Sequence, residues 1–333
     1  MTGDRSTVET EPEGVTAVRR REGLIGRAFD GFVTTGALAE GGMGVLLEAH
    51  HPVLGTLAVV KVLQSELSDD PLAAKRMLVE GQTLSALQHR NVVRVFGFGH
   101  LENGRPWLLF ERLVGQSLGS IIEARGGLPL GEALPLMEQA AAGLEATHQL
   151  SVLHRDLKPD NLFVVIEPDG ARYLKLIDFG IAKPEVALGR ETTDLHTATG
   201  QFVGTVAYGA PELFTGAPFT PPSDVYALGC VFFEMLTGQR PFRAPSLPDL
   251  ARQHLEAQVP RPRTFVRTVP ARLDALVAQM LAKQPSERPT LATVRETLRQ
   301  VMAPATPRWA VLTIVGLLAL SAALLLELFR LDR

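Results

Sequence analysis

The chain of 333 residues has one cysteine, Cys230, and no large excess of either charge. A single cysteine cannot form a disulfide within the chain or a cysteine-based metal site, which favours a reducing compartment for most of the protein. Cys230 lies in the apolar run YALGCVFFEML, a context typical of a small buried core residue. The formal net charge of −3 offers no basic field for a phosphate backbone, so we expect no nucleic-acid partner.

Internal repeats and broad compositional bias are also missing. Hydrophobic residues make up 46% of the chain and charged residues 21%, which is enough apolar material for a real core. The length fits one large domain or two modest ones. Residues 1–23 differ from the rest, because they are polar and show no periodicity, and we expect them to form a disordered tail.

Long apolar runs are absent except near the end of the chain. Residues 309–329, WAVLTIVGLLALSAALLLELF, carry one charge, Glu327. A bilayer core of about 30 Å needs around 20 apolar residues in a helix, and Trp309 and Phe329 would then sit at its two interfaces. A buried helix is the alternative, but it would need apolar neighbours on every face. The run therefore predicts one C-terminal transmembrane helix.

The predicted transmembrane helix has short flanks. The Pro-bearing segment 303–308 would link it to the preceding domain, and residues 330–333 would form a short extracytoplasmic end. Ala319 and Ala323 form a small-xxx-small pair that could support a homodimer. A run this rich in alanine also produces such pairs by coincidence, so both alternatives stay open.

The secondary-structure pattern changes along the chain. Residues 30–62 show short alternating apolar runs between turn residues, which predicts an antiparallel sheet. A helix is expected at 70–88, and strands are expected around 92–99 and 106–111. Longer helices are expected at 132–150, 223–237, 271–282 and 290–302. This order predicts an α+β fold with a small strand-rich lobe and a larger helical lobe, and a cleft between lobes is a common ligand site.

One glycine-rich stretch raises a specific question. In LAEGGMGVLLEAH, residues 38–50, a G-x-G-x-x-G pattern would use Gly41 and Gly44, but its first position is Ala39. The stretch is either a loop whose backbone approaches phosphates or a flexible turn. The pattern alone does not decide between them.

Five further features follow this stretch in order: Lys61 at the end of TLAVVK, Glu80 in the predicted helix, HRDLKPDN at 154–161, LIDFG at 176–180 and GAPEL at 209–213. Each alone could be a strand end, a charged turn or a helix start. Together they form the protein-kinase signature set. Over residues 30–301 the chain resembles bacterial Hanks-type serine/threonine protein kinases.

The resemblance implies a bilobal protein-kinase fold. The kinase domain would occupy residues 30–302, with an N-lobe at 30–113 and a C-lobe at 114–302. In phosphoryl transfer, catalysis is mostly positioning together with neutralisation of negative charge, and these motifs supply the groups for both.

The resemblance assigns catalytic roles to five of these residues, one of which, Asn161, would act as a metal ligand. Lys61 would bind the α and β phosphates, and Glu80 would pair with Lys61 and hold its ammonium in place. Asp156 would act as the base that accepts or orients the substrate hydroxyl proton. Lys158 would contact the γ-phosphate, as in the serine/threonine form of this loop.

The resemblance also implies ATP and Mg²⁺ as cofactors, with Mn²⁺ as an alternative cation. Asn161 and Asp178 supply the hard oxygen ligands that Mg²⁺ prefers. The adenine would lie behind the gatekeeper Phe110, with Val59 in place of the usual Ala narrowing the pocket roof. The expected nucleotide contacts are Ala39, Glu40, Gly41, Gly42, Met43, Gly44, Leu46, Val59, Lys61, Glu111, Leu113 and Phe163.

Regulation is expected in the segment between DFG and APE. Arg155 resembles the family arginine that binds a phosphate on this segment. Thr192, Thr193, Thr197 and Thr199 are the candidate acceptors. We expect autophosphorylation on Thr197 or Thr199; a merely solvated, hydroxyl-rich loop is the alternative.

Three residues resemble structural braces of the C-lobe. Glu212 of APE and Arg288 would form an ion pair that holds the lower part of the lobe together. Asp224 would anchor the backbone of the HRD motif. The sequence therefore predicts bracing residues as well as catalytic ones.

These features predict a serine/threonine protein kinase that transfers the γ-phosphate of Mg·ATP to proteins. A pseudokinase scaffold of the same fold is the alternative, together with a small-molecule kinase of related fold. The predicted helix at 309–329 would anchor the protein in the lipid bilayer of the cytoplasmic (inner) membrane. Because the kinase domain needs ATP, it would face the cytoplasm, and arginines at 295, 299 and 308 against 330 and 333 give a weak bias the same way.

Overall fold

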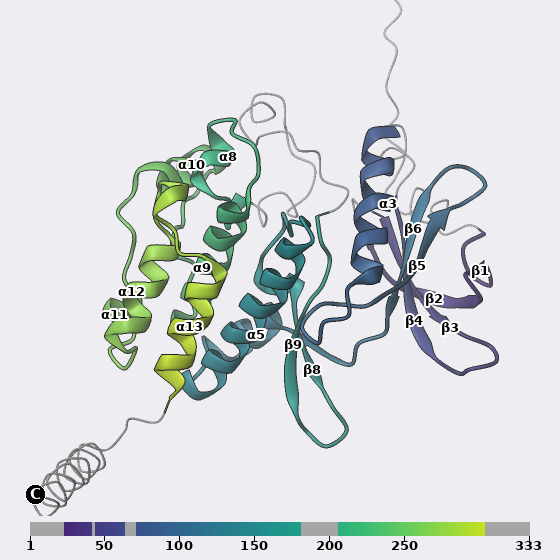
Figure 1. Cartoon of the computed structure of the whole chain (residues 1–333), viewed down its shortest axis with the longest axis horizontal. Helices are drawn as coiled ribbons and strands as arrows, with labels where there is room; N and C mark the ends of the chain where they lie inside the picture. The colour runs from purple at the N-terminus through teal and green to yellow at the C-terminus, as the bar shows by residue number, and fades with distance from the viewer. Residues whose placement is uncertain (1–22, 42–43, 64–70, 181–205, 304–333) are drawn as a thin grey trace, which may run out of the picture.

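A computed structural model describes residues 23–41, 44–63, 71–180 and 206–303 of the chain. A strand-rich N-lobe and a helical C-lobe lie side by side (Figure 1). An antiparallel sheet of the N-lobe has the spatial order β1-β2-β3-β4-β6-β5. Its strands are β1 (Ala28–Phe29), β2 (Phe32–Gly41), β3 (Gly44–His50), β4 (Leu57–Leu63), β5 (Val95–His100) and β6 (Pro106–Glu111).

One apolar face of this sheet forms the core of the N-lobe. Alternate residues of β3 are buried, because successive side chains of a strand point to opposite faces. Val45 and Leu47 of β3 pack in one cluster with Val60 of β4 and Leu109 of β6. The alternating pattern of residues 30–62 therefore predicted this sheet correctly.

Helix α3 (Pro71–Ala86) lies against β5 and β6. Gly81 permits the close approach, since a Cβ at this position would lie 2.7 Å from Leu108 Cδ2 of β6. The adjacent Glu80 is partly buried. The helix expected at 70–88 is confirmed, and its packing brings a carboxylate to the edge of the N-lobe.

The C-lobe combines a small sheet with a helical bundle. The antiparallel strands β7 (Gly115–Ser117), β8 (Leu162–Ile166) and β9 (Arg172–Leu176) lie in this order. The helices are α4 (Leu118–Arg125), α5 (Leu130–Gln149), α8 (Pro211–Phe214), α9 (Pro221–Thr237), α10 (Leu247–Glu256), α11 (Pro262–Phe265), α12 (Ala271–Met280) and α13 (Leu291–Met302), with 3₁₀ turns η1 (Pro159–Asn161) and η2 (Pro285–Glu287).

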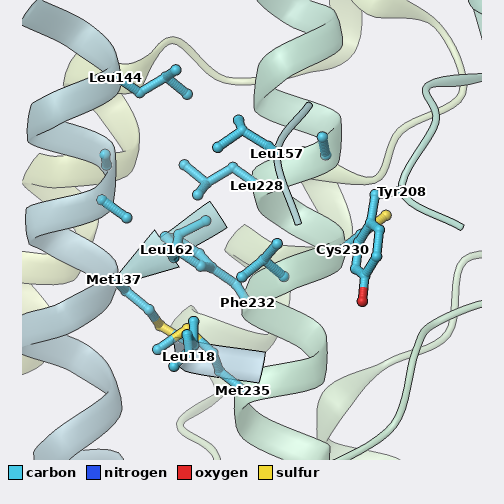
Figure 2. Packing of buried hydrophobic residues seen from close by; sticks show 14 of the residues in the cluster. Leu118, Met137, Leu144, Leu157, Leu162, Tyr208, Leu228, Cys230, Phe232 and Met235 are labelled. Atoms are coloured by element: carbon cyan, nitrogen blue, oxygen red, sulfur yellow. The ribbon is translucent and has the colours of Figure 1, made fainter. Parts of the chain in front are cut away.

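Helix α9 is the centre of the C-lobe. Thr220 and Ser223 form a capping box at its start, and Gly238 ends it in the left-handed conformation, where glycine has no Cβ penalty. Leu228 and Phe232 of α9 lie in one core cluster with Met137 of α5, between the two helices (Figure 2). A helix with apolar residues on almost every face needs this burial on all sides.

The structure confirms the principal expectations about the fold. The two-lobed α+β arrangement, the sheet and the four longer helices are present, and Cys230 is a free thiol with no exposed surface. The sequence did not predict α10 or the β7-β8-β9 sheet. Within the described ranges, no helix is both long and apolar enough to span a bilayer. The predicted transmembrane helix at 309–329 lies outside those ranges, as do most of the predicted tail at 1–23 and the linker segment.

Candidate active site

A cleft of about 380 Å³ lies between the lobes. Of the residues expected to contact the nucleotide, Gly42 and Met43 lie outside the described residues. All of the others line the cleft. The lining includes Ala39, Glu40, Gly41, Gly44, Leu46, Val59, Lys61, Glu111, Leu113 and Phe163. Sequence reasoning missed Val93 and Ile177, which also line the cleft, because an apolar residue before a loop has the same pattern whether it faces a core or a ligand.

The glycine-rich stretch forms the adjoining ends of β2 and β3 at the rim of this cleft. Gly44 has φ +148°, and a Cβ there would lie 2.2 Å from the Val62 carbonyl oxygen, so only glycine fits. Ala39 pairs with Leu46 and is not among the described residues with positive φ. An alanine is therefore tolerated at the position where the G-x-G-x-x-G pattern has its first glycine.

The HRDLKPDN segment brings three of the predicted catalytic side chains together. Asn161 Nδ2 donates to the Asp156 carbonyl oxygen at 2.8 Å and to Asp156 Oδ2 at 3.0 Å. Lys158 Nζ lies 3.2 Å from the same carboxylate oxygen. The Asp156 side chain is 6% exposed and lines the cleft. The carboxylate is thus held by two neighbours and faces the place where a substrate hydroxyl could approach.

A side chain of α9 holds the backbone that precedes Asp156 through hydrogen bonds. Asp224, which is fully buried, accepts hydrogen bonds from the backbone N–H of His154 at 2.9 Å and of Arg155 at 3.1 Å. His148 Nε2 lies 2.8 Å from Asp224 Oδ2. Arg155 has φ +61°, a conformation that costs energy in a non-glycine residue and that the surrounding bonds impose. The anchoring role predicted for Asp224 is confirmed.

His154 connects this segment to DFG. Its ring lies 4.5 Å from the ring of Phe179, and its Nε2 is 3.1 Å from the Ile177 carbonyl oxygen. Burial lowers the pKa of His154, so its ring is neutral at pH 7. Asp178 follows with φ +55°, which turns its carboxylate toward the cleft that it lines.

One predicted ion pair is absent from the arrangement that the described residues adopt. Lys61 was expected to pair with Glu80, but its ammonium contacts Asp178 Oδ1. Glu80 Oε1 instead lies 2.7 Å from Arg155 Nη1. Both observed pairs join an N-lobe side chain to a C-lobe side chain, so each cation pairs with a carboxylate of the other lobe as the packing of the lobes presents it.

A second ion pair was predicted correctly. Arg288 Nη2 lies 2.7 Å from Glu212 Oε2, and Arg288 Nη1 donates to Glu212 Oε1 at 2.8 Å. Ser223 also donates to Glu212, at 2.8 Å. Burial on its own raises the pKa of Glu212, but the hydrogen bonds from Arg288 outweigh it and hold the pKa below its usual range. The pair is charged at pH 7 and braces α8 against the start of α9.

The donor set fits a nucleotide bound with a divalent cation. Both side-chain hydrogen bonds of Asn161 use Nδ2, which leaves its oxygen for a cation, and the Asp178 carboxylate is 43% exposed. No group of three or more His, Cys, Asp or Glu side chains in the described ranges could hold a metal. Two oxygen ligands with additional ligands from phosphates and water are the usual arrangement for Mg²⁺. The predicted acceptors Thr197 and Thr199 lie outside the described residues.

Comparison with known proteins places these features in context. A family model described as the protein kinase domain matches residues 32–300. The serine/threonine-protein kinase PknH of Mycobacterium bovis is 35% identical over 268 residues, which cover 80% of this chain and 43% of that protein. The serine/threonine-protein kinase Pkn1 of Myxococcus xanthus is 32% identical over 298 residues, which cover 88% of this chain and 41% of that protein.

The chain thus spans less than half the length of these curated relatives. Among solved structures, the kinase domain of PknI from Mycobacterium tuberculosis matches with a TM-score of 0.63 at 25% identity. The match covers 83% of this chain and 98% of that one. The similarity therefore extends over both lobes and the cleft between them.

Proposed function

The chain belongs to the protein kinase domain family, and on this premise we propose that it transfers the γ-phosphate of Mg·ATP to serine and threonine hydroxyl groups of proteins. The observation that carries the proposal is the convergence of Lys61, Asp156, Lys158 and Asp178 on one cleft that Gly41 and Gly44 of the glycine-rich stretch also line. The printed names of the relatives, which are serine/threonine-protein kinases, support it.

The residues have distinct tasks in this proposal. Asp156 accepts or orients the proton of the attacking hydroxyl, and Lys158, 3.2 Å from it, contacts the transferred phosphoryl group. Lys61 holds the phosphates on the N-lobe side. Asn161 and Asp178 would hold the Mg²⁺, and the bound cation would supply positive charge beside the phosphoryl oxygens.

Transfer of a labelled γ-phosphate tests this proposal. We expect the purified full chain to phosphorylate serine or threonine in a generic protein substrate when Mg·ATP is supplied. Asp156→Asn keeps the size and most hydrogen bonds of the side chain but removes its basicity, and we expect transfer to fall by at least about 10²-fold while nucleotide binding is retained. A wild-type chain that binds Mg·ATP but transfers nothing would contradict the proposal.

Regulation by autophosphorylation is a second part of the proposal. In the described arrangement Glu80 forms an ion pair with Arg155, and Asp178 forms an ion pair with Lys61. A phosphate on Thr197 or Thr199 would attract the Arg155 guanidinium more strongly than a carboxylate does, because it carries nearly two charges. Glu80 would then be released to pair with Lys61. Substituting both threonines by alanine should lower activity, and full activity with unchanged phosphate content would contradict this part.

Attachment to a membrane is a third part, and it rests on the apolar run 309–329. Helix α13 ends at Met302, so a short segment would connect the C-lobe to the bilayer. The kinase domain would face the cytoplasm, where ATP is present. Fractionation of cells producing the full chain tests this part: we expect the protein in the membrane fraction after alkaline carbonate washing, whereas release by that wash would contradict it.

The pseudokinase alternative finds no support in the described residues. Its two sequence arguments were the substitutions at Ala39 and Val59. Ala39 has no positive φ, and Val59 lines the cleft without closing it. All of the charged side chains that phosphoryl transfer requires are present.

A further inference from the structure

Lys175 in strand β9 is a buried cation that the proposed chemistry does not use. Only 7% of the residue is exposed. Lysine is almost never this deeply buried unless its ammonium is paired, since desolvation of the charge is costly. The position therefore needs a structural explanation of its own.

The Lys175 ammonium joins two other parts of the chain. It lies 2.7 Å from Glu111 Oε1, at the end of β6, and it donates to the Val92 carbonyl oxygen at 3.1 Å. The same Glu111 oxygen accepts a hydrogen bond from the backbone N–H of Arg94 at 2.7 Å. One carboxylate oxygen and one ammonium thus tie β6, the segment before β5 and β9 together.

This cluster borders the nucleotide cleft directly. Glu111 begins the hinge between the lobes and lines the cleft, as does Phe163, which pairs with Lys175 across β8 and β9. Ile177 and Asp178, just beyond β9, also line the cleft. Lys175 itself is not among the lining residues, so it can act on a ligand only through its neighbours.

We propose that Lys175 is a positioning residue that fixes the hinge of the cleft through Glu111 and thereby sets the affinity for the adenine nucleotide. The inference rests on the proposed function for the identity of the ligand. It predicts that loss of the tether weakens nucleotide binding much more than it slows the transfer step, because Lys175 contacts none of the transferring groups.

Paired substitutions separate positioning from simple stabilisation. Lys175→Met keeps the volume but leaves the partly buried Glu111 carboxylate without its cation, and removing one partner of a largely buried pair is destabilising. Glu111→Gln in addition removes that uncompensated charge while its amide oxygen can still accept from Arg94. The double variant should therefore regain most of the lost stability but not the tether.

We expect Lys175→Met to lower Tm by roughly 10 °C and to raise both the Kd for Mg·AMP-PNP and the KM for ATP by about tenfold, with kcat changed less than about threefold. The double variant should recover at least half of the loss in Tm and keep the raised Kd. Arg90→Met is the matched control, because Arg90 stacks on Tyr173 of the same strand at 4.5 Å but is exposed. We expect it to leave Kd and KM unchanged.

The outcomes distinguish this inference from the proposed function. If the wild-type full chain binds no Mg·AMP-PNP, the proposed function is wrong. If the wild type binds the nucleotide and Lys175→Met binds it equally well, the positioning role is wrong. Recovery of Kd together with Tm in the double variant would also overturn it, since Lys175 would then only compensate a buried charge.

Discussion

Arg288 and Lys61 both pair with a carboxylate of the C-lobe, but their surroundings differ. The Arg288 side chain is 0% exposed and also donates to the carbonyl oxygens of Ala282, Pro222 and Lys283. The Lys61 side chain is 19% exposed and its partner Asp178 is 43% exposed. A cation held by several fixed acceptors has one arrangement, whereas a cation held by one exposed carboxylate can exchange it.

The same contrast holds for the residues around each pair. We call the region that contains the Glu212–Arg288 pair, Tyr226 and His254 the base of the C-lobe. There, Tyr226 OH lies 2.9 Å from His254 Nδ1 within a buried aromatic group. At the cleft, Glu80 and Arg155 form their pair with side chains 15% and 13% exposed, next to the exchangeable pair of Lys61. Charged residues at the base of the C-lobe should therefore contribute mainly to the free energy of unfolding, and charged residues in the cleft should contribute mainly to phosphoryl transfer. The following variants test that division.

The largest effect on stability is expected at the base. Arg288→Met leaves Glu212 buried without its cation, and breaking a buried ion pair costs about 3–5 kcal/mol. Urea unfolding of the purified chain measures it. Arg252→Met is the control, because the Arg252 side chain is 68% exposed and its pair with Asp249 should contribute no more than about 1 kcal/mol. Equal unfolding midpoints for Arg288→Met and the wild type would remove the distinction between the two regions.

Low pH should lower the free energy of unfolding through His254, which lies at the base of the C-lobe. Burial lowers the pKa of His254 to about 3, below its value of 6.5 in an unfolded chain. The unfolded state therefore binds this proton first. The contribution is fully present above pH 6.5 and is lost as pH falls toward 3, by an amount on the order of 5 kcal/mol at most.

Urea unfolding at several pH values between 8 and 4 measures this dependence. His254→Phe removes the titrating group and keeps an aromatic ring among Phe214 and Phe242. We expect its unfolding free energy to fall less steeply with acid than that of the wild type. If the unfolding free energies of the two proteins fell in parallel with pH, the burial of His254 would not be the cause of the loss of stability in acid.

A substitution in the cleft should have a large effect on activity and a small effect on stability. Lys61→Met removes a cation that the nucleotide phosphates require, so we expect kcat/KM to fall by at least about 10²-fold. Its ion pair is partly exposed, and the change in unfolding free energy should stay within about 1 kcal/mol. Steady-state transfer assays and urea unfolding on the same preparation measure both. Loss of stability comparable to that of Arg288→Met would contradict the division.

The glycine-rich stretch offers the smallest expected effect and an internal control. Ala39→Gly should change the KM for ATP by less than about tenfold, because Ala39 already has an allowed φ. Gly44→Ala places a Cβ 2.2 Å from the Val62 carbonyl oxygen and should raise the KM by more than tenfold. If Ala39→Gly had the larger effect, the strain in this stretch would lie at Ala39.

Much of this account could be predicted from the sequence. The spacing of the motifs predicted the two lobes. Lys61, Asp156, Lys158 and Asp178 line one cleft, whereas Glu80, Asn161 and Arg155 are not among its lining residues. Asp224 and the pair of Glu212 with Arg288 were also predicted, since the resemblance assigns each residue one partner.

Two features could not be predicted, for physical reasons. The pairs of Lys61 with Asp178 and of Glu80 with Arg155 join the two lobes, so partner choice depends on how the lobes pack together, which no spacing along the chain encodes. No role for Lys175 followed from the sequence, because its contacts are with Val92 and Glu111, which are distant along the chain. Tertiary contacts decided both.

The most direct test of the central claim is to map phosphate on the wild-type full chain by mass spectrometry after incubation with Mg·ATP, beside Asp156→Asn. We expect phosphoserine or phosphothreonine in the wild type, with Thr197 or Thr199 among the sites, and none in Asp156→Asn. A wild-type chain that binds Mg·ATP yet carries no phosphate and transfers none to a protein substrate would show that this cleft holds a nucleotide without using it.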